Sequence, residues 1–298
     1  RRGADLVLNI NASPFHRNKL KERIELISRH SNKFNVPIVY VNQTGGQDEL
    51  VFDGASMVVV PNKNCKVLLP SFETHSMSVD FKDSGNGNLE VKKEFKLNNN
   101  SELEELYKAL VLGTKDYIQK NGFSGAIIGS SGGIDSALTS AIAVDAIGPD
   151  KVKTYMMPFK YTSEMSIKDA AKLAKNLGIQ HEVIEITDIF NSFKKSLEKQ
   201  FKGKKEDSAE ENLQSRSRGV LLMAISNKTG SLVLTTGNKS ETAVGYSTLY
   251  GDTAGGFSVL KDVPKTWVYK LAKFRNTILE VIPSRIIKRE PSAELAPN

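Results

Sequence analysis

The stretch that most constrains the fold is Ser124–Ala146, which combines an apolar run, a glycine-rich turn and a helical pattern. Residues 126–128 are Ala-Ile-Ile and predict a short buried strand. The turn 129–133 follows, and from about Asp135 the apolar residues recur with the spacing of one helix face. Free amides in a turn and the positive end of a helix dipole both favour negative charge. The stretch therefore predicts an anion site between a strand and a helix.

The turn matches neither common nucleotide-binding pattern, because it has no GxxxxGK[ST] lysine and no GxGxxG spacing. It contains SGGIDS instead, which resembles the signature of the ATP pyrophosphatases. Those enzymes hold the pyrophosphate end of ATP and transfer AMP to a substrate. The resemblance implies that the ATP phosphates are bound by eight consecutive residues. These residues are Gly129, Ser130, Ser131, Gly132, Gly133, Ile134, Asp135 and Ser136.

Composition narrows the class of partner. A single cysteine among 298 residues excludes an internal disulfide framework and fits a reducing compartment, so we expect a cytoplasmic location. We see no apolar run of membrane-spanning length and no secretory signal, and we expect no membrane partner. The net charge of +7 comes from scattered lysines with little aromatic interleaving. A small anionic substrate explains this charge more simply than a nucleic acid does.

Both ends of the chain also look cut, so we expect a fragment.

Residues 1 to about 81 predict a β-α-β unit followed by further strands. The expected helix has Leu20, Ile24 and Ile27 on one face and runs to about Phe34. Turns are expected at Asp53-Gly54 and Pro61-Asn62. The expected strands are Leu6–Ile10, Pro37–Asn42, Val51–Val60, Lys66–Leu69 and Ser76–Phe81.

This first part, through LVLNINASPF and VNQTGGQDELVFDGASMVV, resembles the C-terminal half of a nitrilase-fold amidase. The resemblance implies a partial α-β-β-α sandwich and a Glu-Lys-Cys triad whose cysteine lies upstream of Arg1. Cys65 falls in an expected hairpin tip and does not match that nucleophile. Ser13 and Lys19 match the glutamine-binding serine and lysine of the family. The alternatives are a turn hydroxyl for Ser13 and a solvated helix lysine for Lys19.

A polar stretch, Asp83–Asn100, predicts a linker, and we place the domain boundary there, giving domains 1–100 and 101–298. An amphipathic helix is expected over Leu103–Lys120. Beyond it, expected strands alternate with expected helices, which predicts an α/β domain with a doubly wound parallel sheet. Ligands bind such sheets at the carboxyl ends of their strands, where the glycine-rich turn also lies. The expected strands are Lys153–Met157, Val183–Ile186 and Leu232–Leu234, with a helix over Asp169–Leu177 and a charged break over Phe201–Glu210.

Five motifs in order resemble glutamine-dependent NAD synthetases: SGGIDS, ENLQSRSRG, LVLTTGNKSETAVGYSTLYGD, LKDVPKT and PSAEL. The resemblance implies a fold like that of the adenine nucleotide alpha hydrolases. It also implies a ligase that adenylates the nicotinate carboxylate of deamido-NAD with ATP and Mg²⁺. Ammonia derived from glutamine then gives NAD and AMP. A homo-oligomer is the expected assembly.

The resemblance assigns further roles residue by residue. Asp135 and Glu241 match metal ligands, and their hard oxygen donors suit Mg²⁺. The positions matching ATP contacts are Thr236, Lys265 and Ser292, and those matching deamido-NAD contacts are Asn212, Arg218 and Glu241. Asp135 could instead be a carboxylate that favours the helix dipole, and Arg218 a solvated helix arginine.

Other interpretations remain open at this stage. Another SGGxDS ligase, GMP synthetase-like or tRNA-thiolating, is the nearest alternative, although the first carries a different glutaminase and the second needs working cysteines. A nucleic-acid-binding module is suggested only by the positive charge. A non-catalytic remnant that scaffolds an assembly is the third alternative.

Overall fold

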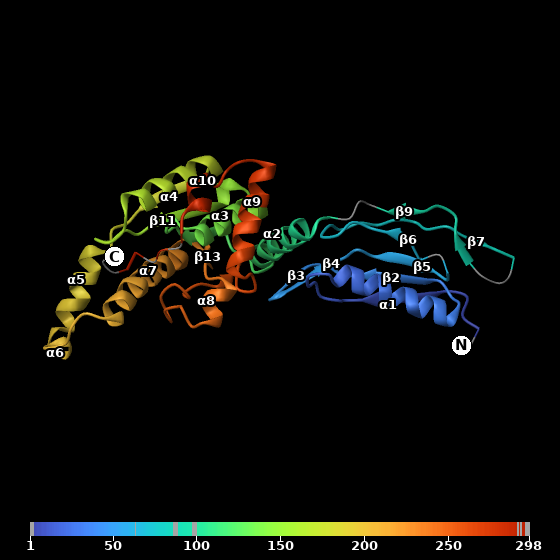
Figure 1. Cartoon of the computed structure of the whole chain (residues 1–298), viewed down its shortest axis with the longest axis horizontal. Coiled ribbons are helices and arrows are strands. Elements are labelled where there is room, and N and C mark those ends of the chain that lie inside the picture. The colour runs from blue at the N-terminus through green and yellow to red at the C-terminus, as the bar shows by residue number, and fades with distance from the viewer. Residues whose placement is uncertain are drawn as a thin grey trace. The chain divides into compact units, whose positions relative to one another are not determined.

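The computed structural model describes residues 3–62, 64–85, 89–96, 100–290, 292, 294 and 295. The chain divides into two compact units, Arg1–Asp116 and Tyr117–Asn298. Each unit combines a sheet with helices, so the α/β class predicted from the sequence is confirmed (Figure 1). Within the described part of the chain, no helix is both long and apolar enough to cross a membrane.

The first unit is built on a mixed five-stranded sheet of order β1-β2-β5-β6-β9. Its outer pairs, β1–β2 and β6–β9, are parallel, and the inner pairs are antiparallel. These strands are β1 (Val7–Asn11), β2 (Ile38–Asn42), β5 (Met57–Val60), β6 (Asn64–Leu68) and β9 (Phe95–Lys96). Two hairpins accompany the sheet, formed by β3 (Thr44–Gln47) with β4 (Leu50–Asp53) and by β7 (Phe81–Asp83) with β8 (Leu89–Val91).

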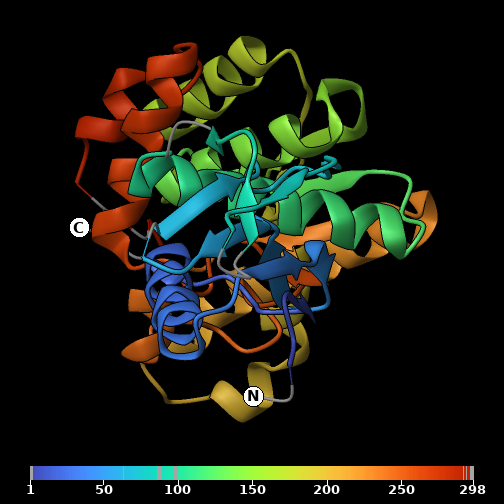
Figure 2. The same cartoon turned by 90° about the vertical axis from the view of Figure 1, so that its right-hand side faces the viewer.

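Helix α1 (Lys19–Phe34) packs its apolar face on this sheet (Figures 1 and 2). Ile27 is buried, and Leu20 and Ile24 pack against the same cluster, as the spacing of these residues predicts. On the sheet, the cluster includes Met57 and Val59. A sheet with a helix on one face matches the partial nitrilase-like sandwich predicted for this part.

Three expectations for the first unit need correction. The strand expected over Val51–Val60 is interrupted, because Gly54 and Ala55 have φ values of 64° and 51° that end β4 before β5 begins. The strand expected over Ser76–Phe81 is absent, since residues 73–78 are all exposed and have no face to bury. The expected linker is not a bare connection, because it supplies β8 and β9.

The second unit is built on a fully parallel sheet of order β12-β11-β10-β13-β14. The central strand β10 is the apolar run predicted from the sequence. These strands are β10 (Ala126–Gly129), β11 (Val152–Met156), β12 (Gln180–Val183), β13 (Leu232–Thr235) and β14 (Phe257–Ser258).

Helices cover both faces of this sheet, as a doubly wound fold requires (Figure 1). Helix α3 is buried nearly all round, with Leu138, Ala141 and Ile142 fully inaccessible, which explains its alanine-rich sequence. It contacts α4, α9 and α10, whereas α7 contacts β10, β13 and α5. The helices are α2 (Glu102–Lys120), which spans the division between the units, α3 (Ile134–Ile147), α4 (Glu164–Leu177), α5 (Thr187–Ser196), α6 (Glu198–Phe201), α7 (Ser208–Thr229), α8 (Lys239–Ala243), α9 (Lys265–Ile278) and α10 (Ser284–Lys288), with a 3₁₀ turn over Pro149–Lys151.

Three expectations for the second unit need correction, two of them because capping outweighs periodicity. Helix α4 begins at Glu164 rather than near Asp169, since the side chain of Ser163 accepts from the amide of Ser166. The edge strand β12 covers residues 180–183, so the strand expected over Val183–Ile186 is misplaced. The break expected over Phe201–Glu210 is shortened, because Asp207 and Glu210 form a capping box that starts α7.

The order of the parallel strands fixes where a ligand can bind. The chain runs from β10 outward to β11 and β12, and then returns to the other side of β10 to form β13 and β14. The connections therefore diverge between β10 and β13, and a crevice opens at the carboxyl ends of these two strands. The glycine-rich turn follows β10 at this point.

The first unit contains an ion pair that is almost completely buried. Arg23 Nη2 lies 2.7 Å from both carboxylate oxygens of Asp53, and the two side chains are only 3% and 2% exposed. Asn42 also donates to Asp53, at 3.4 Å. Removing one member of such a pair leaves the other as an uncompensated buried charge.

We therefore predict that Arg23→Met destabilises the first unit by about 3–5 kcal/mol. The only tryptophan, Trp267, lies in the second unit, so backbone amide exchange in peptides from α1 and β2 is the suitable measurement. Arg29→Met is the matched control, because Arg29 is exposed on the same helix. Equal exchange rates in the two variants would contradict the prediction.

Candidate nucleotide site

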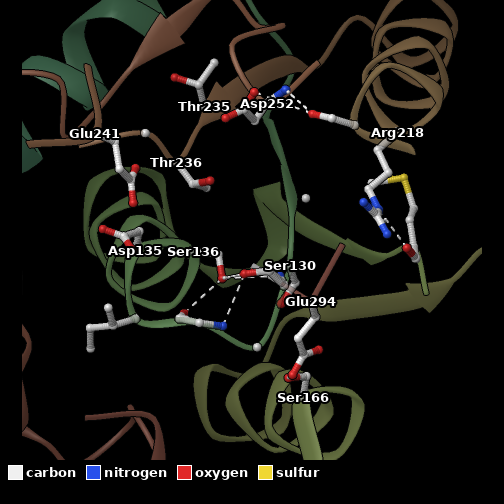
Figure 3. A pocket seen from close by; sticks show the side chains of 18 of the residues that line it. Ser130, Asp135, Ser136, Ser166, Arg218, Thr235, Thr236, Glu241, Asp252 and Glu294 are labelled. Carbon is white, nitrogen blue, oxygen red and sulfur yellow. Dashed lines mark hydrogen bonds between the residues drawn. The ribbon is translucent and has the colours of Figure 1, made fainter. Parts of the chain in front are cut away.

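A cavity of about 520 Å³ lies at the carboxyl ends of β10 and β13 (Figure 3). This volume is in the range of small-ligand and cofactor sites. Residues predicted from distant parts of the sequence come together in its lining. The predicted residues that line it are Gly129, Ser130, Ser131, Gly132, Gly133, Ile134, Asp135, Ser136, Arg218, Thr236, Glu241, Lys265 and Ser292.

The glycine-rich turn is held by its own serines. Ser136 Oγ donates to the carbonyl of Gly133 at 3.0 Å and accepts from the amide of Ser131 at 3.3 Å. Ser131 Oγ accepts from the amide of Gly133 at 3.2 Å. Ser130 is 4% exposed, and its hydroxyl has no partner among the described residues. The turn thus closes on itself through its own serine side chains.

Gly132 allows this turn to lie against the start of α4. Its φ is +76°, which disfavours any residue with a Cβ, and an added Cβ would lie 2.4 Å from the carbonyl oxygen of Ser166. The backbone of the turn therefore makes a contact that no larger residue permits.

Helix α3 begins without a capping side chain. Gly133 occupies its N-cap position and cannot accept from the first amides, whereas Ser163, Asp207 and Asn238 cap α4, α7 and α8. The uncapped amides and the helix dipole favour an anion at this end. The start of α3 thus offers a position for an anion in the lining of the cavity.

Three charged side chains meet beside the turn. The Lys265 ammonium forms an ion pair with Asp135 and lies 3.4 Å from Glu241 Oε1. Burial lowers the pKa of Lys265, but the hydrogen bond and charge of Asp135, with those of Glu241, outweigh it and raise that pKa. Asn238 Nδ2 also donates to Asp135 at 2.9 Å. The two carboxylates predicted as metal ligands therefore converge on one cation.

The donor set at this point suits a hard divalent ion. Mg²⁺ is often held by one or two carboxylates together with substrate phosphates, and Asp135 and Glu241 supply two. Among the described residues, no group of three or more His, Cys, Asp or Glu side chains forms a self-contained metal site. The arrangement therefore fits an ion that is completed by a bound phosphate.

Arg218 supplies a cation on the α7 side of the cavity. Its Nε donates to the carbonyl of Met157 at 2.9 Å, and burial lowers its pKa to about 10. An arginine with that pKa stays charged at neutral pH. No carboxylate in the described part of the chain forms an ion pair with it. The side chain is thus a partly buried charge without a carboxylate partner among the described residues, and not the solvated helix arginine considered above.

Three predicted residues lie elsewhere. Asn212 does not line the cavity, and its side-chain oxygen accepts from Thr248 at 2.7 Å. Ser13 and Lys19 belong to the first unit. The amide of Ser13 donates to Asn42 at 2.8 Å, and the Lys19 ammonium lies 3.9 Å from Glu22. The expectations for these residues rest on the resemblance alone.

The sequence reasoning missed several polar residues of the lining, and three of them show why. Ser166 lies at the start of α4, Asp252 accepts from the amide of Thr248 at 2.6 Å, and Glu294 is bound to Ser166 (Figure 3). Asp252 and Glu294 fall inside two of the motifs quoted above, so the motifs themselves carried a signal for them. Ser166 could be found only from its contact with the turn.

Comparison with known proteins gives a consistent result. Residues 106–298 match the family described as NAD synthase. The chain is 50% identical to a glutamine-dependent NAD(+) synthetase of Acinetobacter baylyi over 99% of its length, which is 54% of that protein. It is 48% identical to the solved glutamine-dependent NAD+ synthetase of Acinetobacter baumannii in complex with ADP, with a TM-score of 0.91, covering 97% of this chain and 55% of that one.

A more distant likeness covers about two thirds of the chain. The NMN synthetase of Francisella tularensis is 28% identical, with a TM-score of 0.60, over 66% of this chain and 78% of that one. The chain spans about half the length of the glutamine-dependent relatives that it matches.

The contact of Gly132 with Ser166 generates a stability prediction. Gly132→Ala should lower the free energy of unfolding by more than the roughly 1–3 kcal/mol that a strained φ costs, because the new Cβ also overlaps the Ser166 carbonyl. Gly178→Ala is the control, since its φ is +68° and nothing lies within 4 Å of its Cβ position. Urea unfolding followed by Trp267 fluorescence measures both variants. Identical midpoints would show that the contact is not tight.

Proposed function

The chain belongs to the NAD synthase family, and from this we propose that its second unit makes NAD from deamido-NAD, ATP and ammonia. The carboxylate oxygen of the nicotinate would attack the α-phosphorus of ATP and release pyrophosphate. Ammonia would then attack the acyl carbon and displace AMP. The observation that carries the proposal is the cavity between β10 and β13, where an uncapped helix, Lys265 and two carboxylates meet.

Gly129–Ser136 are proposed to bind the ATP phosphates, with Thr236, Lys265 and Ser292 as further contacts. The support is the uncapped start of α3 and the ammonium of Lys265 within the same lining. Catalysis of this kind depends mainly on holding two anionic substrates together and on stabilising charge at phosphorus. The positive groups of the cavity serve both purposes.

Asp135 and Glu241 are proposed to hold Mg²⁺. The chemistry supplied by that ion when bound is neutralisation of phosphate charge. Lys265 already lies between the two carboxylates, so it has to share them or turn toward the phosphates when a metal–nucleotide complex enters. Its ammonium can make that exchange because it ends a flexible four-carbon side chain.

Arg218, Asn212 and Glu241 are proposed to contact deamido-NAD. Arg218 has the clearest support, since a partly buried guanidinium without a carboxylate partner among the described residues favours an anionic ligand such as a nucleotide phosphate. For Asn212 the support is the motif resemblance, because the described geometry turns its oxygen toward Thr248.

The first unit is proposed to be part of a glutaminase that supplies the ammonia, with Ser13 and Lys19 binding glutamine. Cys65, the only cysteine in the sequence, does not fit the nucleophile. It is 6% exposed, its thiol donates to the carbonyl of Val67 at 3.1 Å, and burial raises its pKa. The nucleophilic cysteine is expected upstream of Arg1. A homo-oligomer and a cytoplasmic location likewise remain predictions.

The proposal predicts the products of one incubation. The chain with ATP, Mg²⁺, deamido-NAD and ammonium should form NAD and AMP in equal amounts, measured by chromatography. Glutamine should not replace ammonium, because no suitable cysteine is present. Nicotinate mononucleotide in place of deamido-NAD tests the alternative acceptor. AMP formation with nicotinate mononucleotide would contradict the proposal, and so would the absence of AMP with both acceptors.

The metal assignment predicts the effect of Asp135→Asn. This change keeps the shape but removes one of two carboxylates, so pyrophosphate release should fall by about 10²-fold or more while the melting temperature stays close to that of the unchanged chain. Binding of Mn²⁺ in the presence of ATP, followed by its electron paramagnetic resonance, should weaken in parallel. Asp188→Asn is the control, because Asp188 is an exposed residue in the first turn of α5. Normal Mn²⁺ binding by Asp135→Asn would overturn the assignment.

A further inference from the structure

Glu294 is a nearly buried carboxylate with an unusually complete set of donors. Its side chain is 15% exposed and accepts from the amide of Ser163 at 3.0 Å, from Ser163 Oγ at 2.8 Å and from Ser166 Oγ at 2.9 Å. It also forms an ion pair with Arg289. Burial raises the pKa of Glu294, but these hydrogen bonds outweigh it and hold the pKa below its ordinary value.

The donors belong to the start of α4, which also supports the glycine-rich turn. The Ser166 carbonyl is the atom that an added Cβ on Gly132 would meet at 2.4 Å, and the hydroxyl of the same serine binds Glu294. Arg289 Nη1 reaches that hydroxyl at 2.7 Å. One residue, Ser166, therefore contacts the turn through its backbone and Glu294 through its side chain.

A second contact fixes the same C-terminal region to another helix. Gln214, on α7 and 2% exposed, donates through Nε2 to the carbonyl of Leu295 at 2.9 Å. Ser292, Glu294 and Leu295 all line the cavity. The region is thus attached to α4 at Glu294 and to α7 at Leu295. Figure 3 shows Glu294 pointing toward Ser166, beside the turn that carries Ser130 and Ser136.

We infer that Glu294 is a positioning residue of the nucleotide site, whose carboxylate fastens the lining residues Ser292 and Leu295 to the start of α4. It acts through Ser166 and Arg289 on the part of the lining formed by Ser292 and Leu295, which we call the wall of the cavity. The inference rests on the proposed function only for the identity of the ligand, ATP. Releasing this carboxylate lowers the fraction of molecules in which the wall is assembled, so ATP binds with a proportionally weaker apparent affinity.

A purely structural role makes a different prediction. If Glu294 only caps α4, its loss lowers the melting temperature and leaves the ATP affinity of the folded protein unchanged. If it positions the wall, affinity falls while turnover at saturating ATP is preserved, because bound ATP selects the assembled state. A rise in the KM for ATP without a change in kcat therefore separates the positioning role from the purely structural one.

The test compares Glu294→Ala and Glu294→Gln with the unchanged chain, using equilibrium dialysis of ATP with Mg²⁺. We expect Glu294→Ala to weaken ATP binding about tenfold, the size of effect expected from losing a charge-assisted hydrogen bond. Glu294→Gln keeps acceptor oxygen and should weaken binding less. In turnover assays the KM for ATP should rise in the same order, with kcat within about twofold.

The matched control is Glu164→Gln. This change removes a negative charge from the first turn of α4, the same helix start that Glu294 contacts. Glu164, however, is 85% exposed and pairs only with Lys168 among the described residues. ATP binding by this variant should not change. A double-mutant cycle with Ser166→Ala adds a second criterion, since the effects of two coupled residues on ATP affinity are not additive. Unchanged ATP affinity in Glu294→Ala, or additive effects in the cycle, would overturn the inference.

Two further results separate this inference from the proposed function. If the unchanged chain binds ATP but forms no NAD, the proposed reaction fails and the role of Glu294 stands on the binding data. If Glu294→Ala melts too early to assay, amide exchange of Glu294→Gln at the start of α4, with and without ATP, replaces the measurement. Exchange there that does not respond to the substitution would contradict the inference.

Discussion

The second unit depends on one constraint: the first turn of α3 is left without a side-chain cap. Gly133 leaves these amides free of any side chain, and Ser131 and Ser136 bond to each other's hydroxyl and to the backbone of the turn instead. The positive end of the helix is therefore available at the carboxyl end of the central strand. The strand order then places β13 and its polar continuation on the other side of the same crevice.

Charges of both signs line the cavity, and its three cations differ in how they are paired. Lys265 is shared between two carboxylates, and Arg289 is paired with Glu294, whereas Arg218 has only a carbonyl partner among the described residues. A partly buried cation without a counter-ion is costly, and an anionic ligand reduces that cost. Arg218 therefore favours an anionic ligand on the α7 side of the cavity.

Motifs predicted the site better than periodicity predicted the elements. SGGIDS located the turn because this order of glycines and serines is specific to it. In the structure, the first glycine of the motif has a φ of +76°, which a larger residue disfavours. Strand ends were less predictable. Residues 180–183 form β12 only because they pair with β11, a tertiary contact that local pattern does not encode. Ser166 could not be found either, since its importance comes from the approach of Gly132, far away in the sequence. Asn212 matched a motif but points toward Thr248.

The pairing of β10 with β13 has a consequence for the order in which the molecule can form. Ala126 pairs with Leu232, so the two strands that border the crevice are separated by five α-helices and two other strands of the chain. Closing so long a loop is slow, and a chain emerging from the ribosome presents one edge of β10 unpaired until residues 232–235 have been synthesised. The buried apolar face of α3 has to be shielded over the same interval. The crevice is thus a late product of folding, and variants that slow this pairing are expected to aggregate before they lose any contact in the finished site.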